Sequence, residues 1–111
     1  MCIFCSIVKK ELPASVVYED DFVVAFHDIK KFAPTHLLII PKTHIGSALE
    51  VNETNSALIA KCFEAVPKIA EKEGLLNGFR LINNCGKDGG QTVEHFHIHM
   101  LAGFDGLERL V

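Results

Sequence analysis

Apolar and polar residues along the chain follow patterns that predict several short strands and one long helix. Two β-rich runs cover residues 16–18 and 22–26, and the turn-forming acidic residues 19–21 between them indicate a hairpin. The apolar run over residues 36–40 predicts a third strand. Pro41 is expected to end this strand, because proline has no N–H to donate to a neighbouring strand.

Apolar positions over residues 52–72 recur every three or four residues, as they do on one face of an amphipathic helix. These positions are Leu58, Ile59, Cys62, Phe63, Val66, Ile69 and Ala70. Asn52 is a suitable N-cap for this helix, and Gly74 is a suitable C-cap. Pro67 lies inside the helix and is expected to kink it or to leave a carbonyl without its partner.

The remaining segments predict one short helix and two more strands. Residues 3–10 favour a short helix, with apolar residues followed by two lysines near its end. Residues 79–83 and 95–101 are typical of strands, and the glycine-rich loop 85–91 lies between them. The resulting order predicts an α+β fold, with a mainly antiparallel sheet covered by helices.

The composition is typical of a single folded domain that spans residues 1–111. Hydrophobic residues make up 49% of the chain and charged residues 23%, which excludes a mostly disordered protein. A net charge of −3 without a basic block argues against nucleic acid as a partner. No apolar run is long enough for a membrane span, and the N-terminus does not have the pattern of a secretory signal, so we expect a cytoplasmic protein.

The unusual feature of the composition is its content of six His and four Cys. Cys2 and Cys5 form a C-x-x-C pair, which can be half of a zinc site, a redox dithiol or two inert thiols. A redox motif should follow a strand and open a helix, but only one residue precedes this pair, so we favour zinc. Zinc needs two further ligands, and histidines are plentiful. Cys62 is most simply a small core residue of the long helix.

The segment 95–101 carries the most informative pattern in the chain. Successive side chains of a strand point to opposite faces, so His95, His97 and His99 are expected to share one face. Three histidines in register are an unusual choice for a face that only meets solvent. Such a row can bind a metal through all three imidazoles, or it can supply a nucleophile and a general acid.

The glycine-rich loop upstream of the histidines bears on that choice. Residues 84–92 combine glycines with small hydrogen-bond donors, and glycine lets backbone N–H groups approach an anion closely. The loop does not have the residue order of a P-loop, and in isolation it can be an ordinary turn. Beside three histidines it favours a phosphate cradle, because a neutral imidazole can attack phosphorus directly.

The row of histidines has the form H-φ-H-φ-H-φ-φ, where φ is apolar, and the chain thereby resembles the histidine triad (HIT) superfamily. It looks like a small member of the branch of histidine triad nucleotide-binding proteins. Further matching segments follow in the family's order at residues 19–21, 26–29, 34–36, 40–44 and 89–92. The resemblance implies the HIT fold, an antiparallel sheet of about five strands with one long and one short helix. It also implies a homodimer, for which the long helix is the expected seam.

The resemblance implies a role for each residue that matches the family's motifs. His97 would be the nucleophile that takes the nucleoside monophosphate, and His99 would contact the phosphate and stabilise the transition state. The carbonyl of His95 would hold the proton on the far nitrogen of His97, and His36 would support the triad. Asp28 would bind the ribose hydroxyls. The phosphate side would be lined by Asn84, Gly90, Gln91 and Thr92, and the purine slot by Phe4, Ile7, Leu12, Phe26 and Ile29.

Zinc finds its missing partners through the same resemblance, because family members with an N-terminal C-x-x-C look zinc-binding. The ligands implied for this chain are Cys2, Cys5, His44 and His95, a closed tetrahedral set with a structural role. Such a site would tie the N-terminus to the strand that carries the nucleophile. It would leave His97 and His99 free, and no catalytic metal would be required.

The activity implied is hydrolysis of a nucleoside phosphoramidate, which releases a purine nucleoside monophosphate such as AMP through a covalent histidyl intermediate. A dinucleoside polyphosphate hydrolase is the alternative enzyme. A nucleotide-binding module with little turnover and a metal-sensing module are the alternatives from other classes. His99 replaces the glutamine of the uridylyltransferase branch, which favours transfer to water. The tail 103–111 contains no Trp, unlike many members of the branch, so the leaving-group preference stays open.

Overall fold

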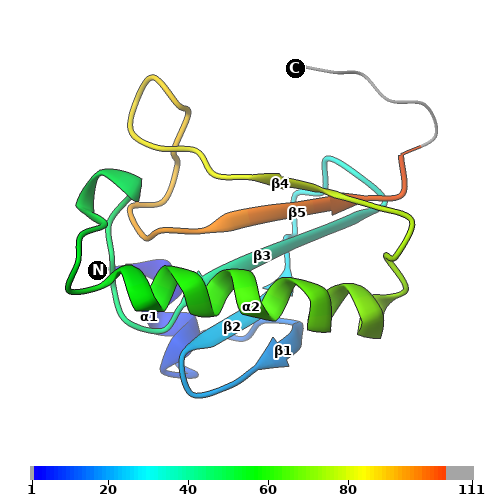
Figure 1. The fold of residues 1–111 in the computed structure, drawn as a ribbon, viewed down its shortest axis with the longest axis horizontal. Helices are drawn as coiled ribbons and strands as arrows, with labels where there is room; N and C mark the ends of the chain where they lie inside the picture. Colours follow the sequence, from blue (N-terminus) through cyan, green and yellow to red (C-terminus); the bar gives the residue numbers. More distant parts are fainter. Residues whose placement is uncertain (1, 105–111) are drawn as a thin grey trace.

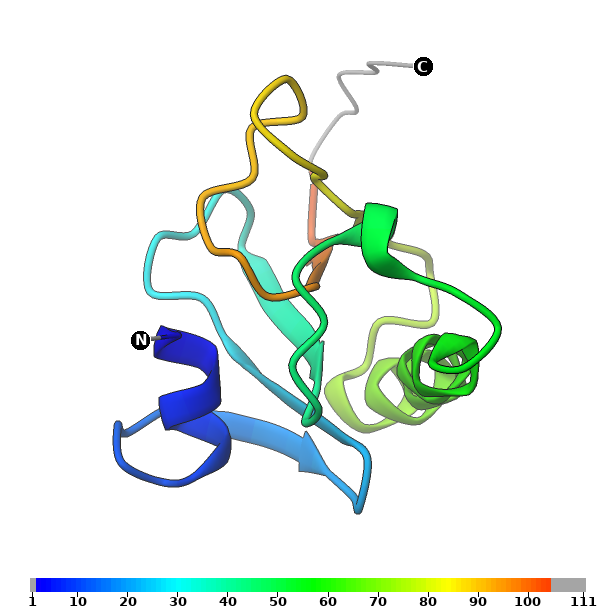
Figure 2. The same cartoon turned by 90° about the vertical axis from the view of Figure 1, so that its left-hand side faces the viewer.

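The computed structural model describes residues 2–104 and contains a five-stranded sheet with one helix on each face (Figure 1, Figure 2). The elements are α1 (Ile3–Val8), β1 (Val16–Glu19), β2 (Val23–His27), β3 (Thr35–Pro41), the 3₁₀ turn η1 (Ala48–Glu50), α2 (Ser56–Glu73), β4 (Arg80–Ile82) and β5 (Ile98–Ala102). The strand order is β1-β2-β3-β5-β4, and each neighbouring pair is antiparallel. The predicted fold class and order of the main elements are confirmed; η1 was not predicted.

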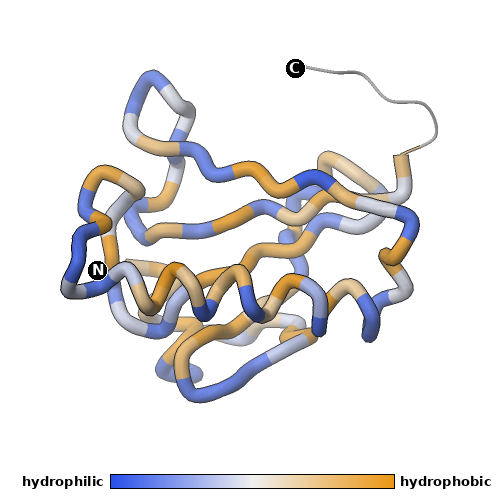
Figure 3. The backbone as a smooth tube through the Cα atoms, in the orientation of Figure 1, coloured by the Kyte–Doolittle hydropathy of each residue, from blue (hydrophilic) through white to orange (hydrophobic). Residues whose placement is uncertain are grey.

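Each face of the sheet has its own apolar cluster, because side chains alternate along the strands. On β2, Val23 and Ala25 pack in the cluster under α2, whereas Val24 and Phe26 pack in the smaller cluster under α1. The apolar residues of β3 divide in the same way, with Leu37 and Ile39 toward α2 and Leu38 and Ile40 toward α1. Figure 3 shows the resulting apolar stretches along β2 and β3. The α1 face is the one that carries the histidines.

The long helix begins later than the sequence predicts. α2 starts at Ser56, and the side chain of Asn52 does not cap its first turn. Instead, Oδ1 of Asn52 accepts hydrogen bonds from the backbone N–H groups of Thr54 and Asn55, at 2.8 and 3.1 Å. These bonds hold the chain in a turn before the helix. Once begun, α2 continues through Pro67.

Both helices end where a residue takes a left-handed backbone conformation. Gly74 follows α2 with a φ of 72°, as its predicted C-cap role requires. α1 ends at Val8 rather than at residue 10, because Lys10 has a φ of 65°, outside the helical region. Lysine at this position gives no sequence signal of a helix end, which is why the prediction ran too far.

The last strand also begins later than predicted, although the bounds of the other strands lie within one residue of the prediction. β5 starts at Ile98, so His95 and His97 precede it. There the backbone carbonyls accept from side chains, and backbone N–H groups donate to loop carbonyls, instead of pairing with a neighbouring strand. The His95 carbonyl accepts from the His97 ring, and the His97 carbonyl accepts from the side chain of Asn83. Sequence periodicity does not reveal such bonds.

The predicted alternation of faces nevertheless holds through this bend. Phe96 and Ile98 belong to the apolar cluster under α2. The rings of His97 and His99 lie on the other side, with centroids 5.1 Å apart, and the His97 ring also contacts Phe4 of α1. The histidines therefore share one face, as the sequence predicts.

Among the described residues, no helix has the length and apolar character needed to cross a membrane. Within the tail without Trp, residues 103–111, the part 105–111 lies outside the described residues.

Candidate functional site

A cavity of about 710 Å³ opens on the α1 face of the sheet. α1, β2, the loop after β2 and residues 92–99 supply most of its walls. It brings together many of the predicted site residues, namely Phe4, Ile7, Leu12, Phe26, Asp28, Ile29, Thr92, His97 and His99. Ile29 is 96% exposed, so it packs little against the rest of the described chain. A largely apolar cavity of this volume with a few polar groups suits a small organic ligand.

Hydrogen bonding around His97 determines which ring nitrogen keeps its lone pair. Nδ1 of His97 lies 2.7 Å from the backbone carbonyl oxygen of His95, an atom that can only accept. In the neutral ring Nδ1 therefore carries the hydrogen, and Nε2 keeps its lone pair. The His97 ring is 3% exposed and stands edge-on to Phe4, with centroids 5.2 Å apart. A neutral imidazole held in this way can act as a nucleophile through Nε2.

A chain of hydrogen bonds gives His99 the complementary form. The backbone N–H of Phe32 donates to Nδ1 of His36 at 3.1 Å, so the hydrogen of a neutral His36 is on Nε2. That nitrogen lies 2.8 Å from Nδ1 of His99 and donates to it, which leaves an N–H at Nε2 of His99. His36 is 1% exposed and does not line the cavity. It therefore contacts His99 from the interior of the protein.

The surroundings of His36 and His99 keep both imidazole rings neutral. Burial lowers the pKa of His36, although Asp28 opposes the shift. Burial also lowers the pKa of His99 to about 4, and repulsion from His97 and His36 adds to the effect. At neutral pH, His99 therefore presents a donor N–H in the cavity where His97 presents an acceptor nitrogen.

We expect the free energy of unfolding to fall as the pH is lowered from about 6.5 to about 4. A histidine of the unfolded chain binds its proton near the upper value, whereas folded His99 does so only at a pH of about 4. The unfolded state therefore binds more protons in this window, and acid favours it. For His99 alone, the loss between about pH 7.5 and about pH 5 is about 2 kcal/mol.

Urea unfolding of the wild type and of His99→Gln at the two pH values measures this contribution. The variant removes the titrating ring, so its stability should change less between the two pH values. If both proteins lose the same free energy of unfolding, the shifted titration of His99 is not the cause.

Asp28 connects the cavity to the loop after β2. Its Oδ1 accepts the backbone N–H of Lys30 at 2.9 Å, and its Oδ2 lies 3.4 Å from Nε2 of His36. One carboxylate oxygen of Asp28 thus orders the loop, and the other lies beside His36, which donates to His99. Asp28 lines the cavity, and its ribose contact stays a prediction.

The glycine-rich loop is shaped mainly by its own hydrogen bonds. Nδ2 of Asn84 donates to the carbonyl of Gly89 at 2.8 Å, and the Gly90 N–H donates within the same turn at 3.1 Å. The amide of Gln91 bonds to the start of the loop and to the segment before η1. Of the loop residues predicted to face phosphate, Thr92 lines the cavity and the others do not. Their phosphate contacts stay predictions.

For AMP, the ligand that the resemblance implies, Gly89→Ala is expected to weaken binding at least about tenfold. A Cβ at Gly89 would lie 2.4 Å from the backbone oxygen and 2.8 Å from the backbone nitrogen of Cys85, so the turn would have to open. Opening would displace Asn84 and the start of the segment that carries the histidines. Titration calorimetry with AMP measures the change.

Asp88→Ala is the matched control for this prediction, because Asp88 is exposed in the same loop. It should leave the AMP affinity within about twofold of the wild type. Equal AMP affinity in Gly89→Ala and Asp88→Ala would mean that the shape of the loop does not affect the cavity.

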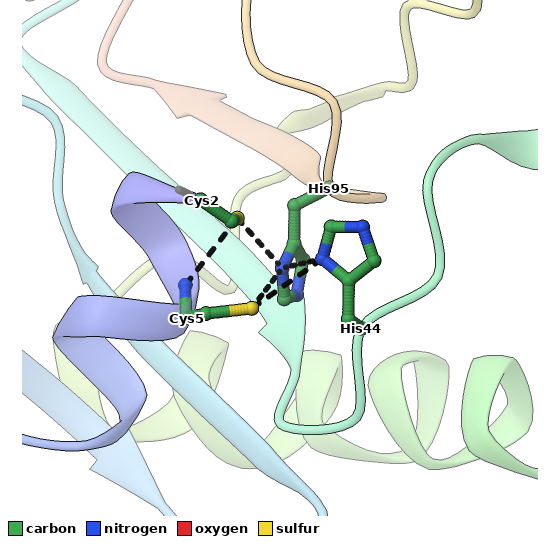
Figure 4. Close-up of side chains that lie close together, drawn as sticks. All are labelled: Cys2, Cys5, His44 and His95. Atoms are coloured by element: carbon green, nitrogen blue, oxygen red, sulfur yellow. Dashed lines mark hydrogen bonds between the residues drawn. The ribbon is translucent and has the colours of Figure 1, made fainter.

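The four predicted metal ligands converge (Figure 4). Cys2 and Cys5 come from the start of α1, His44 from the loop after β3, and His95 from the segment before β5. Sγ of Cys2 lies 3.4 Å from Nδ1 of His95, and Sγ of Cys5 lies 3.4 Å from Nδ1 of His44. The two Nδ1 atoms are 3.3 Å apart. A tetrahedral zinc ion separates two nitrogen ligands by about 3.3 Å, and sulfur from nitrogen by about 3.5 Å.

The chemistry of these donors also suits a metal. Nε2 of His95 lies 2.8 Å from the carbonyl oxygen of Pro41, so it carries the hydrogen and leaves Nδ1 free to ligate. Burial raises the pKa of the Cys5 thiol, and the neighbouring Cys2 adds to the shift, so a bound cation would favour the thiolate there. Two thiolates and two imidazoles are a preferred donor set of zinc. The residues present therefore fit zinc.

A second group, Asp28, His36 and His99, also lies close enough together to hold a metal ion, but its hydrogen bonds oppose one. To ligate through Nε2, His36 would have to move its hydrogen to Nδ1. That hydrogen would then face the N–H of Phe32, and two donors would oppose each other. The hydrogen bonds of His95 thus leave a ring nitrogen free for a metal, whereas those of His36 do not.

Sequence reasoning missed two residues that position the histidines. Nδ2 of Asn83 donates to the carbonyl of His97 at 2.8 Å and so holds the bend before β5. The N–H of Phe32 sets the tautomer of His36. Asparagine at the end of a strand is a weak signal of such a role. A backbone N–H leaves no signal in the sequence at all.

Comparisons with known proteins agree with this architecture. The sequence model of the HIT domain matches residues 9–106. The chain is 48% identical to Protein HitA of Neisseria gonorrhoeae over 100 residues. This match covers 90% of this chain and 94% of that protein. It is 43% identical over 102 residues to the purine nucleoside phosphoramidase of Escherichia coli K12, with 91% and 86% covered. A HIT family hydrolase from Clostridium thermocellum superposes with a TM-score of 0.94 at 46% identity, with 99% and 96% covered.

Proposed function

This chain belongs to the HIT family, and from that premise we propose that it is a hydrolase that cleaves the phosphorus–nitrogen bond of purine nucleoside phosphoramidates. The observation that carries the proposal is the pair of complementary histidines in the cavity. His97 offers a lone pair on Nε2, and His99 offers an N–H. A relative at 43% identity bears the name purine nucleoside phosphoramidase, which supports the same bond as the target.

The reaction proceeds in two displacements at phosphorus. In the first, Nε2 of His97 attacks, the bond to the leaving nitrogen breaks, and the amine departs with a proton taken from solvent. In the second, a water oxygen attacks the same phosphorus, the bond to Nε2 breaks, and the nucleoside monophosphate leaves while a water proton passes to solvent. The His95 carbonyl stabilises the His97 ring while it carries positive charge. The His99 N–H stabilises negative charge on a phosphoryl oxygen.

The nucleoside end of the substrate occupies the part of the cavity between α1 and β2. Phe4, Ile7 and Phe26 give this part an apolar, partly aromatic lining that suits a purine. Asp28 accepts hydrogen bonds from the ribose, because its Oδ2 has no backbone donor among the described contacts. Thr92 and the glycine-rich loop lie on the phosphate side. Dimensions and chemistry of the cavity thus support AMP as the product.

A structural zinc ion belongs to the same proposal. The residues that would hold it are Cys2, Cys5, His44 and His95, whose spacing and tautomers suit a tetrahedral ion. When bound, zinc supplies a cross-link between α1 and the segment before β5 and takes no part at phosphorus. The reduced thiols that such a site needs favour the cytoplasm, and we propose that residues 1–111 act there as a single domain.

We also propose that the protein acts as a homodimer. β4 lies at the edge of the sheet, and Phe63 of α2 is 51% exposed, so an edge strand and an apolar side chain of the long helix are available to a second copy. Analytical ultracentrifugation should give twice the mass of the chain, and Phe63→Glu should give the monomer mass. A wild type that sediments as a monomer at micromolar concentration would refute the dimer.

Turnover of paired substrates tests the proposed activity. We expect kcat/KM for adenosine phosphoramidate to exceed that for a diadenosine polyphosphate by at least about 10²-fold. A guanosine phosphoramidate should be used well and a cytidine phosphoramidate poorly. The opposite ranking of the first two substrates would make the protein a dinucleoside polyphosphate hydrolase. AMP binding without turnover of any of them would make it a nucleotide-binding module.

A further inference from the structure

We infer that metal binding at the four-ligand cluster of Cys2, Cys5, His44 and His95 and nucleotide binding in the neighbouring cavity strengthen each other. The inference rests on the proposed function, since it assumes that a purine nucleotide occupies the cavity. α1 and the backbone of His95 form the link. The metal therefore does more than attach the N-terminus to the sheet, because it also raises the affinity of the cavity for its nucleotide.

α1 forms one wall of the cavity, and it is too short to be stable as a helix on its own. It has six residues, far fewer than an isolated helix needs in water. Sγ of Cys2 accepts the N–H of Cys5 at 3.4 Å, so both thiols lie at the start of this helix. A metal ion bound to both thiols and to His44 and His95 would fasten the helix to the sheet. Fastening α1 fixes the wall of the cavity that it provides.

Phe4 carries this effect into the cavity. It stands between the two cysteines in the sequence, and it is 6% exposed. Its ring contacts the rings of His95, His97 and Phe26 edge-to-face, with centroids 5.8, 5.2 and 5.7 Å apart. One aromatic side chain therefore touches a proposed metal ligand, the proposed nucleophile and a β2 residue of the purine slot.

His95 provides a second path through its backbone. Its ring is held at one nitrogen by the carbonyl of Pro41 and offers the other nitrogen to the metal. Its carbonyl oxygen holds Nδ1 of His97 at 2.7 Å. His95 is fully buried, so an ion that fixes its ring also restrains the carbonyl that orients the nucleophile.

The metal ligands and the nucleotide cavity are also neighbours in space. A smaller cavity of about 420 Å³ borders Cys2 and His44. It shares Ile3, Thr92 and Val93 with the larger cavity, so a single layer of residues separates the two. A displacement of α1 at the metal ligands must therefore change the wall that a nucleotide meets.

Thermodynamic linkage makes the inference testable through the metal affinity itself, with no measurement of turnover. If Zn²⁺ raises the affinity for AMP by some factor, AMP must raise the affinity for Zn²⁺ by the same factor. We expect this factor to be at least about fivefold. Zn²⁺ affinity of the full chain is measured by competition with a chromophoric chelator, with and without saturating AMP. A parallel titration without protein corrects for Zn²⁺ bound by AMP itself.

Two variants separate the proposed link from other causes. Phe4→Leu keeps an apolar side chain but removes the ring contacts with His95 and His97, so the factor should fall to the part that the His95 backbone carries. Phe32→Leu is the control, because Phe32 lines the same cavity but lies outside α1. Its factor should match that of the wild type, even if its AMP affinity is lower.

The outcomes are distinguishable from a failure of the proposed function. A Zn²⁺ affinity that AMP leaves unchanged, in a protein that binds AMP, overturns the inference and leaves the proposed function intact. A full factor in Phe4→Leu also overturns it, because α1 would then take no part in the link. A metal-loaded protein that binds no AMP refutes the nucleotide site itself and the coupling with it.

Discussion

His97→Ala should lower kcat for adenosine phosphoramidate by at least about 10³-fold, because it removes the atom that forms the covalent bond to phosphorus. Neither of the other two histidines of the row can replace it. The Nδ1 of His99 already accepts from His36, so His99 is a donor rather than a nucleophile in its neutral form. His95 lies beyond the His97 ring, with its free nitrogen toward the cysteines. Steady-state turnover with the two proteins at equal concentration measures the loss.

The control must show that His97→Ala remains folded, since the His97 side chain is 3% exposed and its removal leaves a hole next to Phe4. AMP affinity and melting temperature of the variant provide that check. His27→Ala is the matched variant, because His27 also lines the cavity. It should lose less than about tenfold in kcat. A His97→Ala rate within tenfold of the wild type would remove His97 from the mechanism.

Cys5→Ala is expected to have the largest effect on stability. It removes one of four metal ligands, so bound zinc should fall from about one ion per chain to below about 0.2 after dialysis. Loss of an ion that binds only the folded state should lower the melting temperature by at least about 10 °C. Atomic absorption and differential scanning calorimetry measure the two effects on protein purified without chelator.

Cys85→Ala controls for the loss of a thiol as such, because Cys85 lies in the glycine-rich loop and not in the four-ligand cluster. It should keep its zinc and lose less than about 3 °C. A Cys5→Ala protein with the melting temperature and metal content of the wild type would refute the structural zinc site.

The fold was predictable where the sequence has a clear pattern. The β-rich apolar runs in β2 and β3 and the spacing of three and four residues in α2 led to the correct order of elements, and Gly74 marked the end of α2. The errors arose where side chains bond to the backbone. Asn52 turns the chain before α2 instead of capping it, and Asn83 holds the residues before β5 out of the sheet. Hydropathy contains no information about such bonds.

The site was predictable to the extent that its residues match sequence motifs. The histidine row and the C-x-x-C pair led to residues that do lie together, and the four expected metal ligands converge. The tautomers of His36 and His95 could not be predicted from the sequence, because they depend on the Phe32 N–H and the Pro41 carbonyl. Asn84, Gly90 and Gln91 were expected at the phosphate, but within the described structure they shape the loop.

The stereochemical course at phosphorus tests the central claim most directly, that His97 forms a covalent intermediate with the nucleotide. The substrate is an adenosine phosphoramidothioate of a single configuration at phosphorus, hydrolysed in isotopically labelled water. Each in-line displacement inverts phosphorus, so attack by His97 followed by attack by water predicts net retention of configuration. Net inversion would show a single displacement by water and would contradict the account, whatever the rate of hydrolysis.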